Sequence, residues 1–158
     1  MKRDHIFLTP LILFIFLPAV CLSEITENYN NATGKAQIVS TFNQIDYFNQ
    51  VLFFKNAYDS NCTLTLILKQ KEKVKFSNGI MHFTASAFPL TFMGENFEED
   101  ENTKIVTTKA SFDASGPTSR YILTSSSATI VLDSKNFGKI TWVVPSYIFE
   151  EWKDVIKR

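Results

Sequence analysis

The stretch CTLTLIL, Cys62 to Leu68, alternates so regularly that it sets the expected fold class. In an extended strand, Leu64, Leu66 and Leu68 lie on one face, and the residues between them lie on the other. A strand with one strongly apolar face needs a core on that side and partner strands at its edges. The stretch therefore predicts an antiparallel β-domain.

Similar short runs recur along the chain and are separated by polar turns, which is the spacing of an all-β domain. With no helix expected between the strands, they predict two packed antiparallel sheets, a β-sandwich, and a closed barrel is the second choice. The runs are 36–40, 48–54, 73–76, 80–84, 88–93, 104–109, 120–124, 128–133 and 138–144.

Turn signals divide these runs. Asn78-Gly79 lies between two alternating runs and predicts a two-residue type I′ hairpin, because both residues tolerate positive φ. The polar, glycine-containing segments 94–102 and 113–119 are expected to be loops.

The N-terminus has the pattern of a secretory signal peptide over residues 1–23, with basic residues followed by an apolar run and then small residues. The run is shorter than the roughly 20 residues of a membrane span and is interrupted by prolines, so we expect no stable span, although an uncleaved anchor is the alternative. Cleavage after Ser23 is preferred. Cleavage after Ala19 would leave Cys21 on the secreted protein.

Removal of this leader leaves a chain of single-domain size, with a β-sandwich domain expected over 24–145. The tail, 146–158, changes to helical spacing of its apolar residues. A short helix is marginal unless its apolar stripe is buried, so we expect the stripe to dock on the sandwich, ahead of a partner-binding or membrane-surface role. The stripe consists of Ile148, Trp152, Val155 and Ile156.

The charge balance and the glycosylation motifs limit the cellular compartments and the classes of partner that we expect. The chain has 16 basic and 16 acidic residues, so it lacks the basic excess that nucleic-acid binding requires. Two Asn-x-Thr triplets predict N-glycosylation at Asn31 and Asn61 if the chain is secreted. We therefore expect a soluble, extracellular glycoprotein.

The sequence offers no recognisable catalytic centre. After the leader the only histidine is His82, and no nucleophile elbow, zinc-binding motif or phosphate-binding glycine loop occurs. The acidic run 98–101 invites a calcium interpretation, but consecutive side chains diverge, so a solvated loop is preferred. We expect a protein that is not an enzyme and has no cofactor and no metal, although catalysis by carboxylates alone stays open.

Two separated groups of motifs resemble the CUB-like domain of secreted nematode proteins, over roughly residues 34–144. The first is a tyrosine and an asparagine–cysteine pair that lead into an alternating strand. The second is a serine-rich approach to a strand, a short turn, Phe-Gly and a closing strand with Ile-x-Trp. These elements are Tyr58, Asn61, Cys62, Leu64, Leu66, Ser127, Ile130, Leu132, Ser134, Phe137, Gly138, Ile140 and Trp142.

The resemblance implies a jelly-roll-like sandwich, an extracellular location, no catalytic centre and an association with stress and innate defence. Calcium-binding CUB domains use a Tyr-Asp-x-Leu-type stretch that is missing here, so no calcium site is carried over. Related domains pair the cysteine of this strand with an upstream one, and here that is Cys21. A Cys21–Cys62 disulfide is expected only if Cys21 is retained; otherwise Cys62 is a lone buried thiol.

The resulting functional hypothesis is a secreted interaction module that binds an extracellular protein or glycan. The alternative is a small lipocalin-like β-barrel that carries an apolar ligand, suggested by the fifteen Phe residues and the C-terminal helix.

Overall fold

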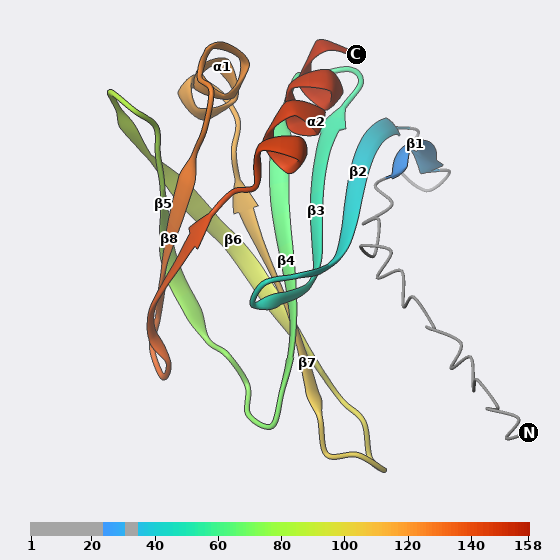
Figure 1. Ribbon diagram of the computed structural model, residues 1–158. Coiled ribbons are helices and arrows are strands. Elements are labelled where there is room, and N and C mark those ends of the chain that lie inside the picture. Colours follow the sequence, from blue (N-terminus) through green and yellow to red (C-terminus); the bar gives the residue numbers. More distant parts are fainter. Residues whose placement is uncertain (1–23, 31–34) are drawn as a thin grey trace, which may run out of the picture.

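The computed structural model describes residues 24–30 and 35–158, and within them the chain is built almost wholly from antiparallel strands (Figure 1). The elements are β1 (Glu24–Asn30), β2 (Lys35–Ile45), β3 (Phe48–Asn56), β4 (Cys62–Gln70), β5 (Phe76–His82), β6 (Ala87–Glu99), β7 (Val106–Asp113), α1 (Pro117–Thr124), β8 (Thr129–Ser134), β9 (Gly138–Val143) and α2 (Ser146–Lys157).

The strands form one sheet in the order β1-β2-β3-β4-β7-β6-β5-β8-β9. β6 belongs to both halves of the sheet. Its residues Ala87 to Leu90 pair with β5, and its residues Thr91 to Glu99 pair with β7. The register shifts between Phe92 and Gly94, and Gly94 has a φ of 149°, a conformation that side-chain-bearing residues rarely adopt. The expected all-β fold is confirmed, and its two layers are halves of a single sheet that curls over at β6.

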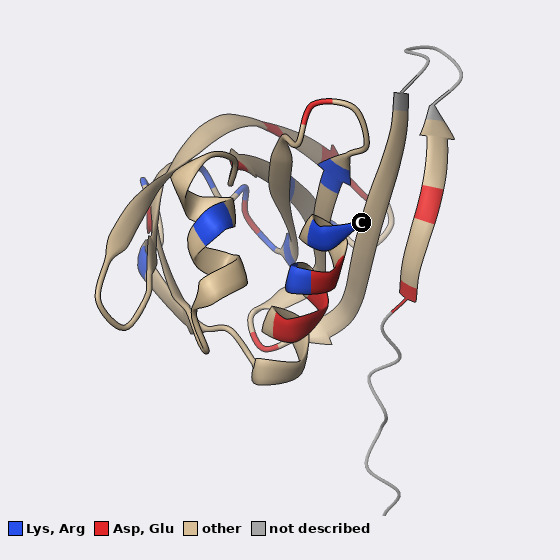
Figure 2. Cartoon of the chain, turned by 90° about the horizontal axis from the view of Figure 1, so that it is seen from above, with Lys and Arg blue, Asp and Glu red and all other residues tan. Residues whose placement is uncertain are grey.

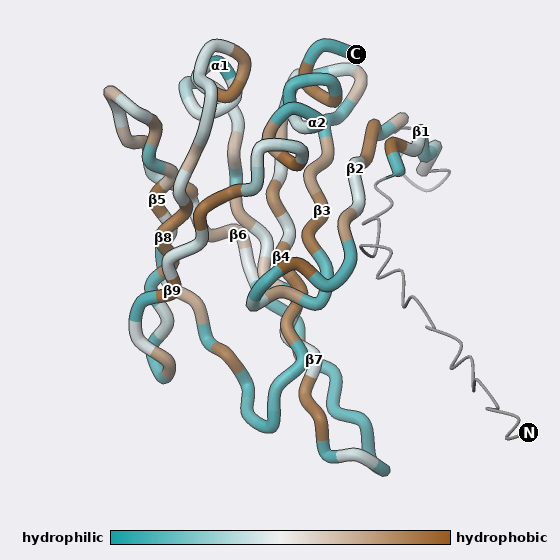
Figure 3. Tube along the Cα trace, in the orientation of Figure 1, coloured by the Kyte–Doolittle hydropathy of each residue, from teal (hydrophilic) through white to brown (hydrophobic). Residues whose placement is uncertain are grey.

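Side chains from both halves fill the space between the layers. Phe48 of β3 meets Trp142 of β9 edge to face, with ring centroids 5.2 Å apart. Phe76 of β5 meets Phe112 of β7 in the same way at 5.9 Å. In Figure 3 apolar residues recur along the strands, whereas hydrophilic residues gather in the lower turns. The alternation read at 62–68 is confirmed, because Leu64, Leu66 and Leu68 are all buried.

The C-terminal helix closes one end of the curled sheet, and Figure 2 shows both helices within its opening. Trp152 stacks on Phe53 at 4.9 Å. Lys55 donates a 2.7 Å hydrogen bond to the Ile156 carbonyl. Of the expected stripe, Ile148, Trp152 and Val155 are fully buried and Ile156 is half-buried. Docking of this helix is therefore confirmed.

Four local predictions were wrong. Of the run 73–76, only Phe76 lies in a strand, as the first residue of β5. Segment 120–124 belongs to helix α1, because Gly116 at φ 63° and Pro117 together start a helix. Asn78-Gly79 makes no turn and lies inside β5; a Cβ on Gly79 would lie 3.0 Å from Leu132 and 3.1 Å from Leu90, so this glycine permits close packing. Residues 94–99 continue β6 and are not a loop.

Candidate functional site

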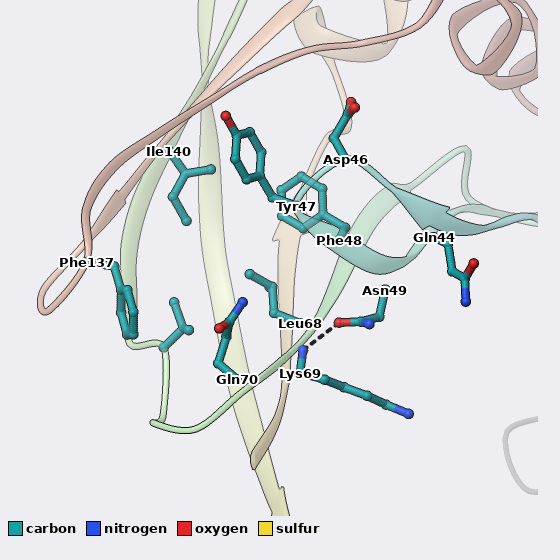
Figure 4. Close-up of a pocket in the computed structure, with 11 residues that line it drawn as sticks. Gln44, Asp46, Tyr47, Phe48, Asn49, Leu68, Lys69, Gln70, Phe137 and Ile140 are labelled. Carbon is teal, nitrogen blue, oxygen red and sulfur yellow. Dashed lines mark hydrogen bonds between the residues drawn. The ribbon is translucent and has the colours of Figure 1, made fainter. Parts of the chain in front are cut away.

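A groove of about 620 Å³ is lined by residues of strands and of the segments between them and by no residue of either helix (Figure 4). Its walls come from the β2–β3 turn, from the end of β4 and the segment after it, and from the β8–β9 hairpin. The lining residues are Gln44, Asp46, Tyr47, Phe48, Asn49, Leu68, Lys69, Gln70, Val74, Phe137 and Ile140. The volume lies within the range of about 300–1,000 Å³ that is usual for small-molecule sites.

The β2–β3 turn and the residues beside it contribute the largest share of the lining. Ile45 pairs with Phe48, so Asp46 and Tyr47 form the turn between them. Gln44 and Asp46 have φ values of 54° and 49°, in the left-handed region that residues other than glycine seldom occupy. Such strain persists only where surrounding contacts hold it, and it recurs at binding sites.

One of those contacts joins the turn to the far edge of the sheet. The Asp46 carboxylate accepts a 2.9 Å hydrogen bond from Nε1 of Trp142, which is only 1% exposed. A buried indole N–H without a partner would be costly, so this bond fixes the turn against β9.

The other two walls are held by asparagine side chains. Asn49 Oδ1 accepts a 2.6 Å hydrogen bond from the Lys69 main-chain N–H, which ties β3 to the end of β4 (Figure 4). Asn136 accepts a bond from the Lys75 N–H at 3.0 Å and donates one to the Lys73 carbonyl at 2.6 Å. These bonds place Val74 and the β8–β9 turn side by side. The groove is therefore a preorganised surface on three connected segments.

The lining combines aromatic rings with planar amides. Tyr47 is 63% exposed and Phe137 is 47% exposed, whereas Phe48, Leu68 and Val74 form a buried floor. Figure 4 shows Tyr47, Leu68, Gln70, Ile140 and Phe137 around a common space, with Phe137 at one end and Gln44 at the other. Among the lining residues, Asp46 and Lys69 supply one negative and one positive charge. Such a surface suits recognition through ring faces and hydrogen bonds.

The predicted glycosylation sites lie elsewhere. Asn61 is exposed in the β3–β4 connection, and its main-chain N–H bonds to Asp59. Its neighbour Cys62 pairs with Lys55, the residue that contacts the end of α2, so Asn61 lies at the helix end of the fold. Asn31, Cys21 and the expected leader 1–23 lie outside the described residues.

Cys62 is a free thiol, 1% exposed, at the start of β4. Burial raises the pKa of Cys62 from 9.0 to about 11, against the opposing influence of Lys55. Its main-chain N–H bonds to the Ser115 hydroxyl at 2.9 Å, which anchors the segment before α1. A buried thiol with a raised pKa is a poor nucleophile.

The remaining candidates do not converge on a site. His82 is exposed at the end of β5. Within the acidic run, Asp100 caps its own turn by accepting hydrogen bonds from the N–H groups of Asn102 and Thr103, and these bonds lower the pKa of Asp100. Within residues 24–30 and 35–158, no group of three or more His, Cys, Asp or Glu side chains could hold a metal ion.

Sequence reasoning did not find the groove. The expected runs 36–40 and 48–54 bracket the turn that carries Asp46 and Tyr47, and an aromatic residue at a polar turn was the available signal. Nothing local indicates that this turn meets residues near 70 and 137.

Comparisons with protein-family models, with curated proteins and with solved structures found no match. In the part of the chain that the structure describes, both helices are too short to cross a membrane.

Proposed function

We propose that the chain is a secreted, N-glycosylated, non-catalytic interaction module that binds an extracellular protein or glycan through the groove. Its motifs resemble those of CUB-like domains, and a role in innate defence or stress response follows from that resemblance alone. The observation that carries the proposal is the groove itself, in which exposed rings and amides lie on a frame fixed by Asp46, Asn49 and Asn136.

The separation of the groove from the sequon at Asn61 supports this proposal. A glycan on Asn61 would project from the helix end, beside the end of α2, and would leave the groove accessible. Exposed aromatic rings also suit binding, because a side chain with only two rotatable bonds loses little conformational entropy when a ligand contacts it.

The alternative, a carrier of an apolar ligand, receives less support from the packing. The space between the layers holds large side chains that are at most 1% exposed. Examples are Phe42, Phe48, Phe53, Trp142 and Trp152.

The test is to secrete the protein from a eukaryotic cell line and to screen it against extracellular proteins and glycans. The matched variants are Tyr47→Ala with Phe137→Ala in the groove, and Tyr58→Ala, which removes a 73% exposed ring from the β3–β4 connection. We expect binding that the groove variant loses and the Tyr58 variant keeps. Binding unaffected by the groove variant, or hydrolysis of a screened compound, would contradict the proposal.

A further inference from the structure

We infer that the ligand of the groove is a neutral carbohydrate, a mono- or disaccharide unit at the end of a glycan chain. This inference rests on the proposed function and names the ligand class for that same site. It follows from three properties of the lining, which are its exposed rings, its amides and its charge.

The exposed rings match the apolar faces of sugars. A pyranose ring presents a face of C–H groups and a rim of hydroxyls, so its recognition requires a flat apolar surface next to hydrogen-bonding groups. Tyr47 and Phe137 border the same space from two different turns and are 63% and 47% exposed (Figure 4). Aromatic rings supply a large apolar contact area at fixed geometry, and tyrosine adds a hydroxyl.

The amides match the hydroxyl rim. A sugar hydroxyl both donates and accepts hydrogen bonds, and a carboxamide offers both functions from one rigid group. The side-chain amides of Gln44 and Gln70 make no hydrogen bond to any described residue, although both line the groove. Asn49 Oδ1 accepts the hydrogen bond from the Lys69 N–H, so the NH₂ group of Asn49 remains as the donor for a ligand. Of these three amides, Gln70 lies beside the space that the two rings border, and Asn49 and Gln44 lie toward the opposite end of the groove (Figure 4).

The charge of the lining argues against an acidic ligand. Asp46 and Lys69 balance one another, and no other residue of the lining carries a charge at neutral pH. The Asp46 carboxylate is already bonded to Trp142. In direct contact with the lining, a sulfated or strongly anionic glycan would meet one lysine and one carboxylate.

The shape of the groove argues against a peptide side chain as the main contact. Protein interfaces draw most of their binding energy from anchor residues in deep, desolvated pockets. Here the buried apolar part of the lining consists of Phe48, Leu68 and Val74, which are 1%, 3% and 1% exposed, and the core below it is filled. Exposed rings above a filled core are better matched to a sugar ring than to a deeply inserted side chain.

The test uses isothermal titration calorimetry of the full secreted protein. The probes are neutral oligosaccharides that end in glucose, galactose, mannose or N-acetylglucosamine, their sulfated counterparts, and a library of random peptides. The protein variants are Tyr47→Ala, Phe137→Ala and Gln70→Ala in the groove, with Tyr58→Ala as the exposed control.

We expect at least one neutral oligosaccharide to bind. Tyr47→Ala and Phe137→Ala should each weaken this binding about tenfold or more, equal to about 1.4 kcal/mol, and Tyr58→Ala should leave it unchanged. Binding should also change little between about 0.05 M and about 0.5 M salt, because a neutral ligand has no charge to screen.

Two results would overturn the inference and can be told apart. Groove-dependent binding of a peptide or a sulfated glycan, without binding of neutral sugars, would replace the ligand class and leave the proposed function standing. No groove-dependent binding of any probe, or sugar binding that all variants retain, would remove both the inference and the site on which it rests.

Discussion

Asp46 has two structural roles in the groove, since it occupies a left-handed turn position and its carboxylate accepts the hydrogen bond that the Trp142 indole N–H donates. The first role follows from its short polar side chain, which tolerates positive φ better than most. The second follows from the burial of Trp142 at 1% exposure. The two roles can be separated by mutation.

Asp46→Ala should destabilise the fold by about 1–3 kcal/mol, because it leaves the buried Trp142 N–H without an acceptor. Urea unfolding measures this loss, and Asp46→Asn, which keeps an acceptor oxygen, should lose less. In a protein that already carries Trp142→Phe, Asp46→Ala should lower the free energy of unfolding only by the amount that Asp46 contributes to the turn conformation. Equal costs in the two backgrounds would show that the hydrogen bond contributes nothing.

The Cys62 thiol makes the free energy of unfolding depend on pH in the alkaline range. The buried thiol has a pKa of about 11, whereas the unfolded chain loses this proton near 9.0. The raised pKa gives stability that is complete below about pH 9 and is lost as pH rises toward 11, because ionisation then favours the unfolded state.

We therefore expect the free energy of unfolding of the wild type to fall more steeply between about pH 9 and pH 11 than that of Cys62→Ala. Guanidinium titrations at a series of pH values provide the measurement. Parallel curves for the two proteins would mean that Cys62 carries no titrating thiol in this range, as a disulfide to Cys21 would cause.

Among the elements, α2 was predictable and α1 was not. In α2 four apolar residues recur at helical spacing over 146–157, and the period alone identifies both the helix and its buried face. In α1 only eight residues are helical, and Tyr121-Ile122-Leu123 is equally compatible with a strand. The Gly116-Pro117 start was read as a loop, although proline favours the first turn of a helix.

The docking of α2 gives a test at the element scale. Trp152→Ala should cost about 3–5 kcal/mol, since it removes a fully buried ring that stacks on Phe53 and meets Trp142. Glu150→Ala, on the same helix, removes the ion pair between the exposed Glu150 carboxylate and Lys153 and should change stability by less than about 1 kcal/mol. Thermal or urea unfolding compares the two. Similar small losses would mean that the helix is not part of the cooperative core.

Across the whole molecule, strand content was readable from the alternation, but the path of the sheet was not. In the order β4-β7-β6-β5-β8, the pairings β4–β7 and β5–β8 join segments far apart in the chain. The order also depends on the irregularity of β6 near Gly94, in a segment that was predicted to be a loop. The groove has the same origin. Its three walls come from residues near 46, 70 and 137, and only the curled sheet brings them together.

The most direct test of the groove as a recognition site is hydrogen–deuterium exchange of the secreted protein with and without the tightest-binding oligosaccharide from the calorimetric screen. We expect added protection in the turns 44–49 and 135–139 and at the end of β4, with no change around Asn61, α1 or α2. Protection confined to the helix end, with the groove segments exchanging as in the free protein, would contradict the assignment of this surface as the binding site.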